Sequence, residues 1–123
     1  MVLTAGQNSH FFVFGKVNGT SVKFLIDTGA SDVVLSPDDA RRLGINLDGL
    51  QFAHVTETAN GLGSSASYTL RSLSIGPITL SNVGVLINKS EMRESLLGMT
   101  FLRDLASVEI RGRQMFLHWN SVP

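Results

Sequence analysis

Short apolar runs separated by turn residues fill most of this chain, which predicts strands rather than long helices. The clearest pair is FFVFGKV at residues 11–17 and SVKFLI at residues 21–26, joined by Asn18-Gly19. Asn-Gly between apolar runs favours a type I′ hairpin turn, because both residues tolerate a positive φ. Further strands are expected at residues 33–35, 51–58, 66–75, 78–80 and 83–87, and a last hairpin at residues 107–119.

Two short helices are expected to interrupt the strands. In SPDDARRLG, Ser36 is expected to cap the first helix and Gly44 to follow its last turn. In MTFLRDL, residues 99–105, apolar side chains recur at helical spacing. Many short strands with regular turns and two small helices predict a compact all-β fold.

Composition and charge limit the class of protein. A chain of 123 residues makes one domain, and 43% hydrophobic residues suit a globular core. The formal net charge is zero, so there is no broad basic field for nucleic acid or an anionic membrane. The absence of cysteine excludes disulfides and thiolate zinc sites. His10, His54 and His118 lack metal-ligand spacing, so no metal site is expected.

No targeting signal is recognisable in the first residues of this sequence. MVLTAGQNSH has neither a basic start nor an apolar stretch, so we expect no signal peptide. No apolar run approaches the ~18 residues that a membrane span needs, and no membrane contact is expected from this segment. The sequence leaves localisation open.

The stretch FLIDTGASDVVLS, residues 24–36, carries the candidate chemistry. An apolar run drives into the core and ends at Asp27, where a carboxylate would be partly desolvated and suited to general acid or base work. One carboxylate does little to a peptide bond, whereas two that share a proton can activate water and protonate the carbonyl oxygen. The chain has one D-T-G, so a twofold dimer would supply the second Asp27.

The residues around Asp27 fit that demand, but a simpler interpretation exists. Thr28 can tie two loops together, Gly29 lets the backbone approach the carboxylates, and Ala30 leaves room for substrate. Against this, a given tripeptide occurs by chance in roughly 2–3% of chains of this length. Asp27 could then be only an Asx-turn residue that ends a strand.

Three further features favour the active-site interpretation. Apolar triplets flank the D-T-G loop on both sides, as a buried active-site loop requires. A glycine-rich hairpin tip, ANGLGSS at residues 59–65, lies about thirty residues downstream, where a lid could close over a peptide. In SLLGMTFL, residues 95–102, Gly98 would let a strand pass close behind the loop.

Together these motifs resemble the retroviral-type (retropepsin-like) aspartic proteases, and most closely their bacterial relatives. The resemblance covers roughly residues 11–119, with residues 1–10 as a polar N-terminal segment and possible linker and residues 120–123 as a tail. The motifs in family order are FLIDTGAS, DARRLGI, TANG at residues 58–61 and LLGMTFL.

The resemblance implies a closed β-barrel-like monomer, a homodimer with one aspartate from each subunit, and a flap over an extended peptide. By it Asp27 is catalytic and Ser31 stands where viral members often carry a second acid. The supporting residues that it implies are Thr28, Gly29 and Gly98. The substrate contacts that it implies are Ala30, Ser31, Ala59, Asn60, Gly61, Leu62 and Gly63.

The sequence therefore predicts a dimeric aspartic endopeptidase that cuts extended polypeptide without metal, cofactor or nucleic acid. The alternative keeps the fold and drops the chemistry: a catalytically silent dimerisation or peptide-binding module. Bacterial relatives are often tethered to the inner membrane, with the protease domain in the periplasm. A periplasmic and a cytoplasmic location both remain open for this chain.

Overall fold

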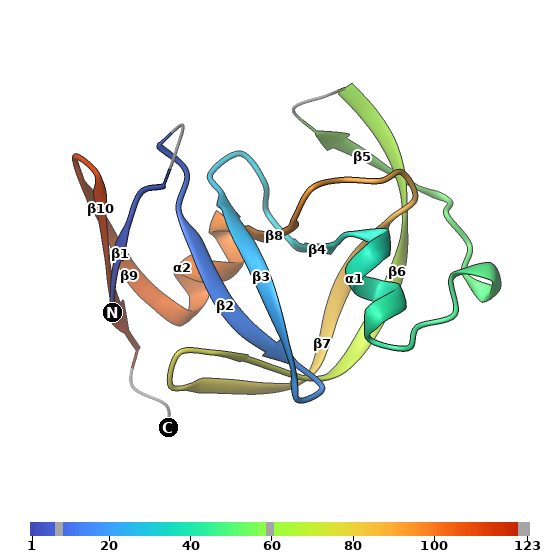
Figure 1. Ribbon diagram of the computed structural model, residues 1–123, viewed down its shortest axis with the longest axis horizontal. Helices are drawn as coiled ribbons and strands as arrows, with labels where there is room; N and C mark the ends of the chain where they lie inside the picture. Colours follow the sequence, from blue (N-terminus) through green and yellow to red (C-terminus); the bar gives the residue numbers. More distant parts are fainter. Residues whose placement is uncertain (7–8, 59–60, 121–123) are drawn as a thin grey trace.

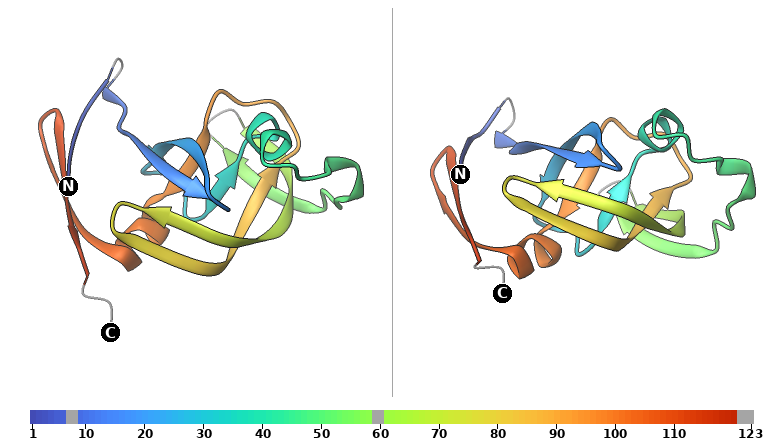
Figure 2. Two further views of the ribbon diagram at one scale, coloured as in Figure 1. Left: turned by 60° about the horizontal axis from the view of Figure 1, so that its bottom comes forward. Right: turned by 90° about the horizontal axis from the view of Figure 1, so that it is seen from below.

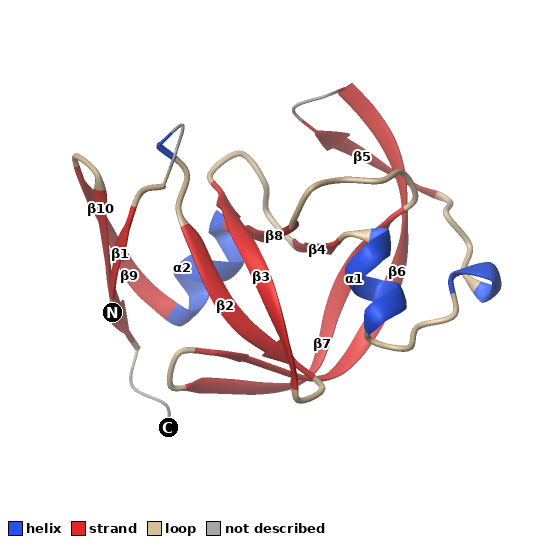
Figure 3. Ribbon diagram, in the orientation of Figure 1, coloured by secondary structure: helices blue, strands red, loops and turns tan. Residues whose placement is uncertain are grey.

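The fold is built almost entirely from strands, as the sequence predicts (Figure 1 and Figure 3). The computed structural model describes residues 1–6, 9–58 and 61–120. The strands are β1 (Val2–Thr4), β2 (Phe12–Val17), β3 (Thr20–Asp27), β4 (Val33–Leu35), β5 (His54–Thr58), β6 (Gly61–Ile75), β7 (Ile78–Asn88), β8 (Ser95–Gly98), β9 (Ala106–Arg111) and β10 (Gln114–Trp119). The helices are α1 (Pro37–Arg42), the 3₁₀ turn η2 (Leu47–Gly49) and α2 (Met99–Leu105).

Six of the strands close into a barrel. Their order is β2-β3-β8-β4-β7-β6, and β6 pairs back onto β2 through residues 73–75, so the ring has no open edge there. β5 extends the sheet beyond β6, and α1 lies beside β4 (Figure 1). The closed, mostly β architecture expected from the sequence is confirmed.

Local sequence explains the first hairpin of the barrel. Asn18 and Gly19 both have positive φ, 49° and 84°, as the type I′ turn requires. Along β3, alternate residues point into the core, and Val22, Phe24 and Ile26 are buried. Burial of this face fixes the register with β2 and carries the strand to its end at Asp27.

The β6–β7 hairpin is longer and more continuous than expected. The two runs at residues 78–80 and 83–87 form the single strand β7, paired with β6 from Ser65 to Ile75. Asn82, between the two runs, has a φ of 56°, yet the pairing resumes on both sides of it. Because this strand is so long, one hairpin spans the barrel and also carries β5.

Helix α1 is fixed at both ends as predicted, and a buried serine network holds it to β8. The Ser36 hydroxyl accepts from Asp39 N at 3.1 Å, and Gly44 follows the helix with φ 83°. The buried Ser95 Oγ accepts from Ser36 N at 2.9 Å and donates to Asp39 Oδ2 at 2.6 Å. A charge-assisted bond of this kind inside the protein holds the helix against the strand that faces the D-T-G loop.

The two ends of the chain form a second, three-stranded sheet in the order β1-β10-β9, beside the barrel (Figure 2). β1 lies in residues 1–10, which were interpreted as a polar N-terminal segment and possible linker. The backbone of Met1 exchanges hydrogen bonds with Leu117, at 2.9 and 2.8 Å. Met115 and Leu117 of β10 are fully buried, so they pack in the core of their own chain and not in a subunit contact. No helix in the described part of the chain is long and apolar enough to cross a membrane.

We predict that Ser95→Ala lowers the free energy of unfolding by about 2 kcal/mol, because it orphans a buried backbone N–H and removes the donor to Asp39. Urea denaturation followed by circular dichroism measures it. Ser81→Ala, at an exposed position on β7, is the control and should change that free energy by less than about 0.5 kcal/mol. Equal effects of the two substitutions would contradict the importance of the network.

Candidate active site

Asp27 is the last residue of β3 and is partly buried. Its Oδ1 accepts a hydrogen bond from Gly29 N at 2.9 Å, and Ala30 N donates to Asp27 O at 3.2 Å. The first of these bonds is the Asx-turn contact that the simpler interpretation expected. It also holds the carboxylate in one orientation, and no other side-chain hydrogen bond to Asp27 forms within the described residues.

The loop after Asp27 rests on the start of α2. Gly98 N donates to Asp32 O at 3.0 Å, Met99 N to Ala30 O at 2.9 Å, and Phe101 N to Ser31 O at 3.1 Å. Thr28, Gly29 and Ser31 are exposed on the other side of this loop. The loop is therefore held by backbone from behind while its outer side stays open to solvent or to another molecule.

Gly98 makes this close approach possible. It is buried, it pairs in register with Asp27 across the parallel β3–β8 ladder, and a Cβ atom placed on it would lie 2.5 Å from Ser31 O and 2.6 Å from Asp32 N. Real Cβ atoms do not come so near to backbone atoms. A side chain at this position would push the D-T-G loop away from β8.

Asp27 opens onto a groove of about 980 Å³. One wall is the β5–β6 hairpin, from which Leu62 and Gly63 contribute, and the other is the segment between β7 and β8. The residues that line the groove are Leu25, Asp27, Asp38, Leu62, Gly63, Asn88, Ser90, Glu91, Met92, Arg93, Glu94 and Leu96.

The groove brings together some of the expected substrate contacts and not others. Leu62 and Gly63 line it with Asp27, whereas Gly61, Ala30 and Ser31 do not. Ala59 and Asn60 lie outside the described residues. Leu62 leaves 78% of its surface exposed, which is unusual for a leucine and places an apolar side chain beside the groove.

Sequence reasoning missed one wall of this groove. The sequence suggests nothing more for Glu91, Arg93 and Glu94 than a solvated turn or helix face, yet they line the same groove as Asp27. Arg41 of α1 contacts this segment through Glu91 at 3.0 Å, and it also pairs with Asp38 of its own helix at 2.9 Å. The hydrogen bond to Glu91 raises the pKa of the Arg41 guanidinium above its usual value. Nothing in the local pattern of the segment signals this placement, because the contact depends on α1.

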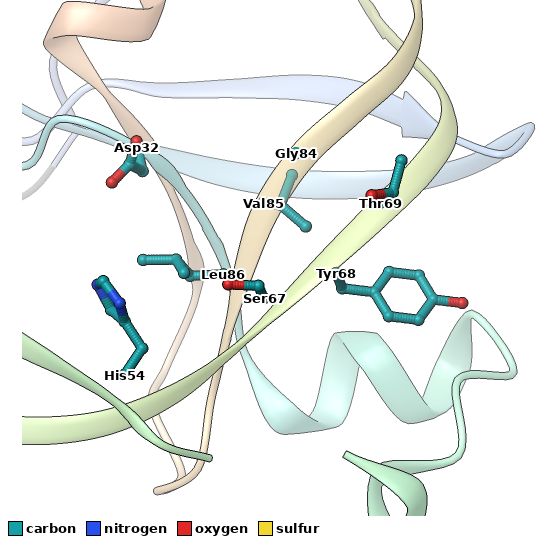
Figure 4. A pocket seen from close by; sticks show the side chains of 8 residues that line it. All are labelled: Asp32, His54, Ser67, Tyr68, Thr69, Gly84, Val85 and Leu86. Atoms are coloured by element: carbon teal, nitrogen blue, oxygen red, sulfur yellow. The ribbon is translucent and has the colours of Figure 1, made fainter. Parts of the chain in front are cut away.

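A second hollow of about 440 Å³ lies between the loop before β4, β5 and the β6–β7 face (Figure 4). It is lined by Asp32, His54, Ser67, Tyr68, Thr69, Gly84, Val85 and Leu86. Neither Asp32 nor His54 was expected at a site. Asp32 could have been singled out because it directly follows D-T-G-A-S. Among the described residues, no three acids, histidines or cysteines are placed to hold a metal ion.

Comparison with known proteins identifies the family. Residues 13–104 match the family model of the gag-polyprotein putative aspartyl protease. The chain belongs to the retropepsin-like aspartic protease family. A crystal structure of a retropepsin-like aspartic protease from Rickettsia conorii is 32% identical to this retropepsin-like chain, with a TM-score of 0.86, and the match covers 97% of this chain and 89% of that one.

A second solved structure and two uncharacterised proteins also match this chain. The protease of EIAV in complex with an inhibitor shares the fold, with a TM-score of 0.66 at 19% identity over 83% of this chain and 93% of that one. Uncharacterised proteins of Sinorhizobium and Rickettsia prowazekii are 37% and 31% identical over 95% and 97% of this retropepsin-like chain. The chain spans about half the length of these two relatives, 51% of each.

We predict that Gly98→Ala lowers the free energy of unfolding by about 3 kcal/mol, because the new methyl group meets backbone that cannot move aside. Urea denaturation measures this. Gly84→Ala, in strand β7, is the matched control, since a Cβ atom at that position would meet nothing within 4 Å. Equal stability of Gly98→Ala and the unsubstituted protein would show that the loop does not depend on this contact.

Proposed function

We propose that this chain is an aspartic endopeptidase domain that works as a homodimer and hydrolyses extended polypeptide. One observation carries the proposal: a partly exposed carboxylate, Asp27, stands at the end of a core strand and opens onto a large groove. Membership of the retropepsin-like family supports the same reaction. The proposal concerns this domain, whatever else a longer protein contains.

The proposed chemistry needs two Asp27 carboxyl groups that share one proton. The ionised group takes a proton from water as the water oxygen attacks the peptide carbonyl carbon, and the protonated group donates to the carbonyl oxygen. Collapse of the tetrahedral intermediate returns a proton to the amide nitrogen, and the C–N bond breaks. Gly29 N–H holds one carboxylate oxygen during these steps, and Thr28 is available to tie the two loops.

We assign the β5–β6 hairpin to the role of flap. Its register, from His54↔Ser65 to Thr58↔Gly61, makes it a regular two-stranded arm that extends beyond the barrel. Leu62 and Gly63 already face the groove. Closure of this arm over a peptide would bury Leu62 and exclude water from the two carboxyl groups.

Asp27→Asn tests the chemistry. Asparagine keeps an oxygen that can accept from Gly29 N, so the fold should survive, but the amide cannot take a proton from water. Cleavage of an unfolded protein substrate should fall by at least about a hundredfold while the melting temperature stays the same. The control is Asp48→Asn, which changes an exposed carboxylate outside the groove; this variant should cleave the substrate at the normal rate.

The test also separates the two candidate functions. Undiminished proteolysis by the Asp27→Asn variant would rule out catalysis by the Asp27 carboxyl groups. A dimeric, folded protein that binds peptides and cuts none at any pH would instead support the silent peptide-binding module.

Few surfaces of the single chain are available to form the proposed dimer interface. The exposed D-T-G loops offer a small surface, well below the ~1,200 Å² of stable interfaces. The terminal strands, which could add to it, are already paired within their own chain. These two facts favour a weak dimer that substrate stabilises by binding across both chains.

We therefore predict that specific activity falls in proportion to protein concentration below the dimer dissociation constant, by mass action. Sedimentation velocity over the same concentrations, with and without a peptidic inhibitor, gives the dimer fraction. The inhibitor should raise that fraction. Constant specific activity where sedimentation finds only monomer would contradict the shared pair of Asp27 carboxyl groups.

A further inference from the structure

We propose that the outward face of β2 and β3 is a second contact for the polypeptide substrate, outside the groove, and that it receives a stretch with apolar and acidic side chains. This β2–β3 face consists of Phe12, Phe14, Lys16, Lys23 and Leu25. The inference rests on the proposed endopeptidase function and adds to it a contact that short peptides would not reach.

The β2–β3 face is apolar where the strand pattern leads one to expect polar residues. Successive side chains of a strand point to opposite sides of the sheet, and the inward side here is filled by buried valine, phenylalanine and isoleucine side chains. On the outward side Phe14 leaves 67% of its surface exposed, and Phe12 and Leu25 are half-buried. Large apolar side chains gathered on an outward face indicate a surface that another molecule covers.

Two lysines give this face a positive charge. Lys23 pairs with Phe14 across the ladder, and its Nζ lies 4.3 Å from the centroid of the Phe12 ring. Lys16 points to the same side of β2, and neither lysine forms an ion pair with a residue that the structure describes. Every residue of β2 and β3 is described, and Asp27 at the end of β3 is the one acid among them. The face is therefore suited to apolar side chains that have carboxylates beside them.

The β2–β3 face continues directly into the groove. Leu25 pairs with Phe12 in the ladder, and it also lines the groove with Asp27. Lys23, Leu25 and Asp27 stand on the same side of β3, two residues apart. At about 3.3 Å per residue, Lys23 lies roughly 13 Å along the strand from Asp27. A polypeptide longer than the groove can thus leave it past Leu25 and lie against Phe14 and Lys23.

The strands beneath this face form a rigid support. β2 and β3 pair without interruption from Phe12↔Leu25 to Val17↔Thr20. On the inward side, a Cβ atom placed on Gly15 would lie 2.7 Å from Ile75 Cδ1, so the packing there leaves no spare room. The outward side chains take no part in that packing, and they can be substituted without disturbing the core.

Polypeptide suits this face better than nucleic acid or lipid. Proteins that bind single-stranded nucleic acid follow its backbone with a positively charged groove. The groove that adjoins this face is instead lined by four carboxylate side chains and one arginine, and Arg41 pairs with two of those acids. The same acids repel an anionic membrane. A polypeptide meets no such conflict, because its neutral and acidic stretches can occupy the groove and the face separately.

Peptides of two lengths test the inference. The short peptide holds only a cleaved sequence that fits the groove. The long peptide adds at both ends the tract Glu-Phe-Glu-Leu after a Gly-Ser spacer of about four residues, which spans the distance to Phe14 at about 3.3 Å per residue. The long peptide should exceed the short one in kcat/KM by about fivefold to tenfold, mainly through a lower KM. A long peptide that carries Lys-Ser-Lys-Ser instead should show no advantage.

Substitutions on the face should remove this advantage. In Phe14→Ser the ratio of kcat/KM for the long over the short peptide should fall towards one, and in Lys23→Gln it should fall by about twofold, less so at high salt. Val2→Ser on β1 and Arg103→Gln on α2 remove an exposed apolar and an exposed cationic side chain elsewhere, and they should keep the ratio. Melting temperatures verify that each variant folds. An unchanged ratio in Phe14→Ser overturns the inference and leaves the endopeptidase proposal standing.

Binding separates this inference from the proposed function. Fluorescence anisotropy measures the affinity of the long and short peptides for Asp27→Asn and for the double variant with Phe14→Ser. Tighter binding of the long peptide that the second substitution removes supports the β2–β3 face even if the unsubstituted protein cuts nothing.

Three further measurements examine the other occupants of the face. Oligothymidylate and phosphatidylglycerol vesicles are tested on the same two proteins, and sedimentation velocity gives the dimer fraction of each. Binding of either probe more tightly than the long peptide, with loss in the Phe14→Ser variant, overturns the inference. A lower dimer fraction in that variant also overturns it, because the face would then be a contact between subunits.

Discussion

The contact between Gly98 and the D-T-G loop is the constraint on which the rest of the site depends. β8 has only four residues, yet it pairs with β3 on one side and with β4 on the other. The five residues between Asp27 and β4 belong to no strand, and the carbonyl groups of the last three accept from N–H groups of Gly98 and the first turn of α2. The position of the loop is thus set by backbone atoms, which do not change rotamer.

The opposite end of β8 is held by side-chain hydrogen bonds. Ser95, at the other end of the strand, ties α1 to the barrel through Ser36 and Asp39. α1 in turn holds one wall of the groove through Arg41. A four-residue strand therefore positions both the candidate carboxylate and one wall of the groove onto which it opens.

Local features could be predicted from sequence, and features that depend on distant pairing could not. The turn at Asn18-Gly19 and the end of α1 at Gly44 follow from backbone preferences of single residues, so they were predicted correctly. β1 was missed because its partner, β10, lies more than a hundred residues away and three residues carry too little pattern. The runs at residues 78–80 and 83–87 were expected as separate strands, because a turn residue such as Asn82 gives no hint that pairing resumes beyond it.

The same distinction applies to the site. Asp27 and Gly98 could be located because each stands in a short motif whose chemistry requires that residue type. Asp32 and His54 could not be paired in advance, since they lie on a loop and a strand that meet only once the β6–β7 hairpin folds between them. Glu94 looked like an ordinary surface acid for the same reason.

The terminal sheet is built from strands of one chain, so its formation does not require a second copy. β1 pairs with β10 of the same chain, so within the described residues the terminal strands form a sheet inside a single copy. In the proposed dimer, dissociation would then expose two loops without separating the strands of a sheet. Under that proposal the single chain would be inert, and activity would appear only where copies of the chain are concentrated together.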